Sequence, residues 1–253
     1  MAKKLLVLLK DRVFPEVLRE AKRISDRLGF AVEVYCLRCG GDRVRELLEV
    51  LNSLQLTTEV KGSDRPPKEV LVEERPYLTL LPKPRLNPLA HAFKKPWSEK
   101  LAEEVDEFNL YLVEEGLDEP RRALLYADRD RSSEAYLREA YRFLSALGVE
   151  FKFVTVFDER YYELLIKKEH PEVEAKEILG RMFTDYVNAV REKVKRALGL
   201  ERVELIPLKG EEGRTLPYFA RTHGFDLLAV SHAVESKEEI VENSETHLLL
   251  FKN

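Results

Sequence analysis

Short apolar runs alternate with segments of helical periodicity along this chain, and the whole order occurs twice. Residues 5–9 form a continuous apolar run that is typical of a buried parallel strand. Apolar residues at helical spacing follow, and they end at Gly29, a residue type that favours a helix C-terminus. Sequential strand–helix–strand units require right-handed crossovers and a mostly parallel sheet. The pattern therefore predicts an α/β fold.

Each half of the sequence predicts five strands and is long enough for one domain. The strands expected in the first half are residues 5–9, 31–36, 56–60, 77–81 and 109–113. Those expected in the second half are residues 123–127, 151–157, 203–208, 225–230 and 247–251. Residues 114–122 contain Gly116 and Pro120 and form the natural joint. We therefore predict two tandem five-stranded parallel-sheet domains, residues 1–116 and 117–253.

Composition excludes several classes of protein. The 253 residues are 44% apolar, which supports packed cores, and the net charge of −4 gives no indication of a nucleic-acid partner. The apolar runs are too short to cross a membrane. The N-terminal residues show no secretory cleavage pattern, and two cysteines make no disulfide framework, so we expect a cytoplasmic protein.

The amide and charged residues indicate a thermophilic source. Gln55 is the only glutamine, and Met182 is the only methionine besides Met1, whereas Lys, Arg and Glu are abundant. Heat degrades amides and increases the value of surface ion pairs, so this balance is typical of thermophile proteins.

Three segments of the second half share a pattern with a known family. An apolar run over residues 123–127 leads into Asp128, a serine-containing helix start follows at Ser133, and residues 224–231 read Gly-Phe-Asp-Leu-Leu-Ala-Val-Ser. In these segments the second half resembles the universal stress protein family. The first half matches more loosely, through residues 5–29 and the strand order. The resemblance implies a tandem member whose domains are Rossmann-like, of the adenine nucleotide alpha hydrolase-like type.

Nucleotide-binding members of this family hold phosphate on Gly-x-x-Gly, a spacer, and then Gly-Ser or Gly-Thr. The corresponding positions here are Ser231, Val234 and Asn243-Ser244, so only the serine is retained. The segment also carries five glutamates against one lysine: Glu235, Glu238, Glu239, Glu242 and Glu245 against Lys237. Two like charges about 4 Å apart repel by roughly 1 kcal/mol even in water. We therefore expect that the second domain does not bind ATP in the family manner.

The resemblance also says where a nucleotide would lie if one binds. Asp128 and the backbone around Val156 would flank the base and ribose, and Ser244 would donate to phosphate. ATP or AMP would then be the cofactor. The alternative for Asp128 is a helix cap or a turn residue.

The first domain lacks phosphate-loop glycines, and basic residues follow its predicted strands. They are Lys10 and Arg12, then Arg38 and Arg43, and then Lys83, Arg85, Lys94 and Lys95. If they converge on one edge of the sheet, that edge would attract an anion or an acidic partner. The alternative is an ordinary solvated surface of charged loops.

Three smaller motifs carry competing interpretations. Cys36 and Cys39 have the spacing of a redox dithiol or half a zinc site, but without a second pair we favour two ordinary thiols. Asp128-Arg129-Asp130 is similar to the acidic motif of magnesium-dependent phosphate hydrolases, although Asp226 precedes its strand and falls at the wrong edge. His232 and His247 form a pH-sensitive pair if they meet at one crevice; the alternative is two isolated surface histidines.

These observations favour a regulatory or interaction protein of the universal-stress type. We expect the two halves to pair through their fifth strands as an intramolecular pseudo-dimer, because both strands would otherwise be exposed edges. A protein partner or self-association as a homodimer would follow, with no nucleic acid and no membrane. The alternatives are an adenine-nucleotide-binding stress sensor and a magnesium-dependent phosphate hydrolase. No catalytic residue or metal ligand is identified.

Overall fold

The computed structural model describes residues 3–85 and 95–253. The first half contains strands β1 (Lys4–Lys10), β2 (Ala31–Leu37), β3 (Glu59–Ser63), β4 (Leu78–Lys83) and β5 (Leu110–Glu114), with helices α1 (Pro15–Leu28), α2 (Gly41–Ser53), α3 (Pro67–Glu74) and α5 (Trp97–Glu104). The second half contains strands β6 (Arg122–Tyr126), β7 (Glu150–Phe157), β8 (Leu205–Lys209), β9 (Leu227–Ser231) and β10 (His247–Phe251), with helices α6 (Glu134–Leu147), α7 (Glu159–Glu169), α8 (Glu172–Leu198), α9 (Glu212–Thr222) and α10 (Lys237–Asn243). The predicted α/β class is confirmed.

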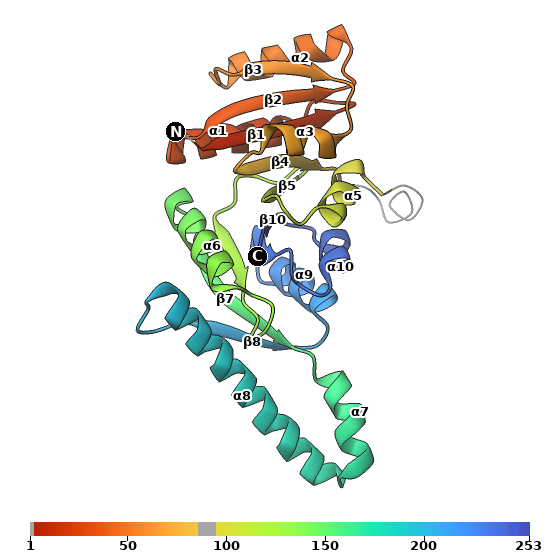
Figure 1. Cartoon of the computed structure of the whole chain (residues 1–253), viewed down its shortest axis with the longest axis vertical. Coiled ribbons are helices and arrows are strands. Elements are labelled where there is room, and N and C mark those ends of the chain that lie inside the picture. The colour runs from red at the N-terminus through yellow and green to blue at the C-terminus, as the bar shows by residue number, and fades with distance from the viewer. Residues whose placement is uncertain (1–2, 86–94) are drawn as a thin grey trace.

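The strands of the described residues form one ten-stranded sheet in the order β3-β2-β1-β4-β5-β10-β9-β6-β7-β8. Each half is parallel within itself and has the same internal order, as Figure 1 lets the reader follow. The halves meet at β5 and β10, which run antiparallel with Tyr111 opposite Leu249. The predicted pairing of the fifth strands is thus confirmed, and the two sheets are continuous.

The central strands are buried on both faces, which explains their unbroken apolar runs. In β1, Leu5, Val7 and Leu9 point into one core, and Leu6 and Leu8 point into the other. The helices α1, α2, α6 and α8 cover the first face, and α3, α5, α9 and α10 cover the second. Side chains from both halves share each core, so the two halves are packed together as well as hydrogen-bonded.

The edge strands carry features that discourage pairing with another sheet. Pro207 lies in β8 and has no backbone N–H to offer, and β3 carries the charged Glu59 and Lys61.

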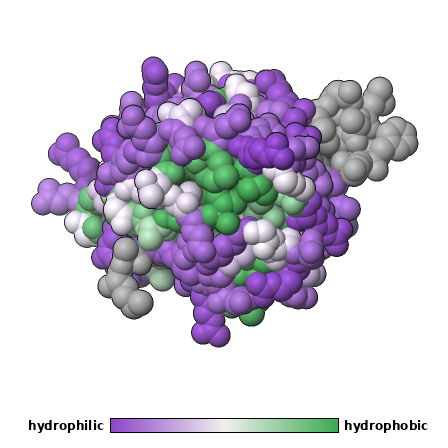
Figure 2. Space-filling view, turned by 90° about the horizontal axis from the view of Figure 1, so that it is seen from above, coloured by the Kyte–Doolittle hydropathy of each residue, from purple (hydrophilic) through white to green (hydrophobic). Residues whose placement is uncertain are grey.

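Figure 2 views the end of the molecule formed by the first half, where hydrophobic side chains gather in one area. Leu48 of α2 is 44% exposed.

The structure differs from the sequence prediction at one strand and adds one helix. The third strand lies at Glu59–Ser63 rather than residues 56–60, because the buried Leu56 closes α2 by donating its N–H to the Leu51 carbonyl. Helix α7 was not predicted; Asp158 caps it by accepting the Arg160 N–H at 3.1 Å. With α8 it forms a hairpin that extends away from the sheet in Figure 1.

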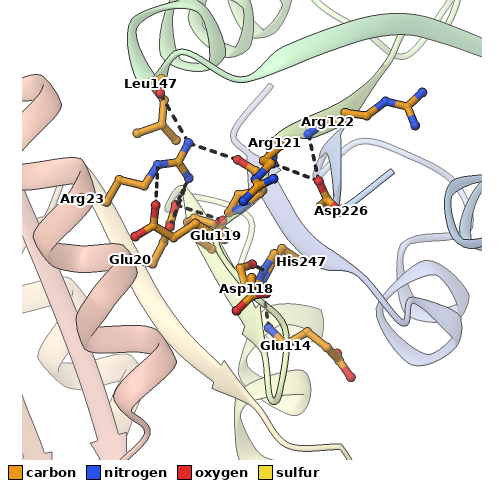
Figure 3. Close-up of polar contacts among 12 residues, drawn as sticks. Glu20, Arg23, Glu114, Asp118, Glu119, Arg121, Arg122, Leu147, Asp226 and His247 are labelled. Carbon is orange, nitrogen blue, oxygen red and sulfur yellow. Dashed lines mark hydrogen bonds and ion pairs between the residues drawn. The ribbon is translucent and has the colours of Figure 1, made fainter. Parts of the chain in front are cut away.

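The joint between β5 and β6 is fixed by polar contacts that cross the two halves (Figure 3). Arg23 of α1 pairs with Glu20 at 3.1 Å and donates to the carbonyls of Pro120 at 3.2 Å and Leu147 at 3.4 Å. These contacts hold the joint against both halves. The predicted domain boundary between residues 116 and 117 stays a prediction.

His247 is fixed as a neutral ring at the same joint. Its Nδ1 accepts the Glu114 N–H at 3.1 Å, and its Nε2 donates to the Asp118 carbonyl at 2.8 Å. Burial lowers the pKa of His247. His232 instead follows β9 at the opposite end of the neighbouring strands, where Phe251 lies opposite Ser231. Both histidines are buried, so the predicted pair and the surface alternative are both wrong.

Candidate functional site

A cavity of about 730 Å³ lies beyond the carboxyl ends of β6 and β7, where open α/β sheets place their ligands. The α7–α8 hairpin forms one wall. The lining residues include Asp128, Val156, Tyr186, Glu212 and Ser236. Two of the residues predicted by resemblance, Asp128 and Val156, are therefore brought together there.

Asp128 is 8% exposed, and both of its carboxylate oxygens accept hydrogen bonds. Oδ1 accepts the backbone N–H groups of Asp130 at 2.7 Å and Arg131 at 2.6 Å, and Oδ2 accepts the Tyr186 hydroxyl at 2.7 Å. Burial and the neighbouring Asp128 charge raise the pKa of Tyr186, so its hydroxyl keeps its proton. Asp128 thus acts as the turn residue that we gave as the alternative.

The three arginines at the cavity are each paired with a carboxylate of the same cavity. Arg129 pairs with Asp130 at 2.9 Å, and Arg131 pairs with Glu235 at 2.7 Å. Arg160 pairs with Asp158 at 2.7 Å and with Glu211 at 3.0 Å. Hydrogen bonding to the arginines lowers the pKa values of Asp130 and Asp158. The carboxylates therefore offset the positive charge that these guanidinium groups would offer an incoming phosphate.

The cavity is acidic as a whole. Seven carboxylates and three guanidinium groups line it. Glu212, at the first turn of α9, accepts a hydrogen bond from the Tyr126 hydroxyl on Oε1. Burial raises the pKa of Glu212, and the charge of Asp128 adds to that effect. Such a lining repels the negative charge of a triphosphate.

The predicted phosphate residues lie elsewhere. Ser231 ends β9, and its hydroxyl oxygen accepts the Ala233 N–H at 3.0 Å, while Val234 is 5% exposed. Ser244 is the C-cap of α10, and its carbonyl accepts a hydrogen bond from Lys83 of the first half. None of Ser231, Val234 and Ser244 is among the described residues that line the cavity.

The position of α10 explains where Ser244 lies. Helix α10 begins directly after Ser236, so the serine beside the start of the helix is Ser236, which does line the cavity. The spacer before the helix is shorter than the family pattern implies.

The loop between β9 and α10 is anchored on the first half. Lys237, the lysine of this segment, donates to the Glu103 carbonyl at 2.8 Å and pairs with Asp106 at 2.5 Å. His232 Nε2 donates to the Phe108 carbonyl at 2.8 Å. Burial and the Lys237 charge lower the pKa of His232 to about 4. The positive charge of the loop is thereby directed away from the cavity.

At least four of the eight basic residues predicted to form an edge of the first half are paired with carboxylates. Lys83 is buried and pairs with Glu114 at 3.3 Å. The other ion pairs are Arg12 with Glu115, Arg43 with Glu46, and Lys95 with Glu103. Lys94 lies outside the described residues. The ion pairs favour the alternative of an ordinary charged surface.

The two remaining motifs are placed clearly. Asp226 accepts hydrogen bonds from the backbone N–H groups of Arg121 and Arg122 at the amino ends of β6 and β9. Asp128 lies beyond the opposite, carboxyl end of β6. Within the described part of the chain, no cluster of three or more His, Cys, Asp or Glu side chains is arranged to hold a metal ion. Cys36 and Cys39 are joined by a disulfide, with their Cα atoms 5.5 Å apart, so the favoured interpretation of two free thiols is wrong.

Solved structures with a similar fold include universal stress proteins and a transporter domain. The chain aligns over 99% of its length with 93% of a protein of Pseudomonas aeruginosa UCBPP-PA14 assigned to the universal stress proteins, at 14% identity and a TM-score of 0.66. It aligns over 98% with 96% of a universal stress protein from Archaeoglobus fulgidus DSM 4304, at 11% identity and 0.60. The cytoplasmic domain of a prokaryotic cation chloride cotransporter aligns over 99% and 95%, at 13% identity and 0.55.

These likenesses confirm the resemblance to universal stress proteins at the level of the fold, over nearly the whole chain. No protein-family model matches the sequence, and no curated protein matches it. In residues 3–85 and 95–253, no helix has the length and apolar character needed to cross a bilayer.

Proposed function

We propose that this chain is a regulatory or interaction protein of the universal-stress type whose second-half cavity does not bind ATP in the family manner. The observation that carries the proposal is the ion pair between Arg131 and Glu235 at 2.7 Å. Glu235 occupies the loop where nucleotide-binding members hold phosphate on glycines. Its carboxylate partly neutralises the charge of Arg131, which lines the same cavity, and adds negative charge beside it.

The helix that follows the loop supports the same proposal. Glu238 and Glu239 lie in the first turn of α10, where negative charge interacts favourably with the helix dipole. Backbone N–H groups at a helix start bind anions when that position is free of carboxylates. The residues present therefore do not fit a nucleoside triphosphate, and we derive no catalytic step that uses such a ligand.

In this proposal the chain is a cytoplasmic protein that uses its surface to bind either a protein partner or a second copy of itself. The fifth strands, which would be exposed edges in a single half, already pair inside this chain. Further self-association would use another surface.

An adenine-nucleotide sensor is the second candidate, and one observation favours it. The cavity lies at the position that the family resemblance assigns to the nucleotide, and both Asp128 and Val156 line it. A hydrolase is less consistent with the geometry, because both oxygens of Asp128 accept hydrogen bonds and Asp130 pairs with Arg129.

The three functions are separated by analysis of the purified full chain. Denaturation followed by chromatography of the supernatant reveals any retained nucleotide, and we expect none. Magnesium-dependent phosphate release that Asp130→Ala abolishes would favour the hydrolase. Retained ATP or AMP in stoichiometric amount would favour the sensor and contradict the proposal.

A further inference from the structure

The disulfide between Cys36 and Cys39 lies at the carboxyl end of β2, in the half of the chain remote from the cavity. Cys36 is the penultimate residue of β2 and is 1% exposed. Cys39 precedes the N-cap Gly40 of α2 and is partly exposed. Cys36 is thus buried in the core, whereas Cys39 packs against that core and is partly exposed.

A structural role explains this cross-link poorly. A disulfide stabilises a fold chiefly by closing a long loop, and this one spans a sequence separation of 3. Strand β2 is already held on both sides by β1 and β3. The turn itself is held by the Arg38 N–H, which donates to the Ser63 carbonyl at 2.9 Å. The fold therefore has little need of the bond.

The surroundings of Cys39 suit thiol chemistry instead. Helix α2 is 13 residues long and begins at Gly41, two residues after Cys39, and a helix start favours a thiolate. A Cβ atom added at Gly40 or Gly41 would meet nothing within 4 Å, so the chain beside Cys39 is open to an approaching molecule.

We propose that Cys36 and Cys39 form a reversible dithiol–disulfide site whose reaction partner is a dithiol, either a small molecule or the reduced motif of another protein. This inference is independent of the function proposed above. It gives the first half of the chain a chemical activity of its own.

The exchange is balanced in two steps. A thiolate of the reductant attacks Cys39 Sγ, the bond to Cys36 breaks, and its electron pair leaves on Cys36 Sγ, which takes a proton. The second thiolate of the reductant then attacks the mixed disulfide and releases Cys39. The chain gains two electrons and two protons, and the reductant becomes a disulfide.

The test uses the folded full chain with dithiothreitol as the reductant. Free thiols are trapped with a maleimide and counted by mass, while circular dichroism monitors the fold in the same sample. We expect two labels on the folded, reduced chain and none after treatment with oxidised glutathione. The proposal is overturned if the disulfide resists dithiothreitol until the chain unfolds, or if the thiols do not pair again.

Two single variants test the assigned direction of attack. In Cys36→Ala, the remaining Cys39 thiol should react with maleimide in the folded chain at least about tenfold faster than Cys36 does in Cys39→Ala, because accessible thiolates react first. Equal rates, or faster labelling of Cys36, would overturn the proposal that Cys39 receives the incoming thiolate. The wild-type experiment stands by itself if either variant fails to fold.

Discussion

Tyr186 donates a hydrogen bond of 2.7 Å to Oδ2 of Asp128 and so ties the long helix α8 to the turn after β6. Tyr186 also accepts a hydrogen bond from the Thr155 hydroxyl at 3.2 Å. The carboxylate that the family resemblance assigns to nucleotide binding is therefore part of the internal framework of the cavity wall.

Removal of this hydroxyl should destabilise the fold. Tyr186→Phe leaves Oδ2 of Asp128 buried without a partner, which costs about 1–3 kcal/mol of the free energy of unfolding. Urea denaturation measures the loss. Tyr218→Phe is the matched control, because Tyr218 is 63% exposed, and it should change stability little. Equal stability of the two variants would show that the bond contributes nothing.

Arg23 should be essential for the stability of the joint. Arg23→Met leaves the carboxylate of Glu20, which is 2% exposed, without its cation, and breaking such a buried pair costs about 3–5 kcal/mol. Arg19→Met is the control, because Arg19 is more exposed and lies 3.9 Å from Glu16. Adding Glu20→Gln to Arg23→Met should restore part of the stability. A double variant no more stable than the single one would contradict this account.

Acid should destabilise the chain through His232. Its folded-state pKa of about 4 lies below the ordinary value of 6.5, so the unfolded chain binds a proton that the folded chain does not. The free energy of unfolding should therefore fall as the pH drops from 6.5 to about 4, by on the order of 3 kcal/mol from this group. Below that pH both states are protonated, and His232 contributes no further loss.

The variant His232→Gln isolates this contribution. Glutamine can still donate to the Phe108 carbonyl but does not titrate, so the slope of stability against pH between 6.5 and 4 should become shallower. Denaturation curves at several pH values give the slope. An unchanged slope would mean that His232 is protonated in the folded chain or accessible to water.

The sequence was sufficient for the fold but not for the details of the site. Apolar runs and glycine stops such as Gly29 and Gly199 place the central strands and helices, because burial on both faces leaves a clear pattern. The pairing of β5 with β10 was predictable for a related reason: both strands are apolar and would otherwise be edges.

The site depended on contacts that no local pattern contains. Tyr186 reaches Asp128 from 58 residues away, and the burial of His232 requires the first half to cover the loop after β9. Ser244 lies at the end of α10 and not at its start, because the loop after β9 is shorter than the spacing in the family pattern. The disulfide was missed because the spacing of Cys36 and Cys39 is equally compatible with thiols, and the turn at Arg38 decides between them.

The central claim is that carboxylates have replaced the phosphate cradle of the second half. Calorimetric titration of the full chain with ATP and magnesium, and separately with AMP, tests it most directly. We expect no binding tighter than roughly 1 mM in the wild type, and measurable binding once Glu235→Gly and Glu238→Gly are introduced together. Micromolar binding of ATP by the wild type, unchanged in that double variant, would contradict the claim.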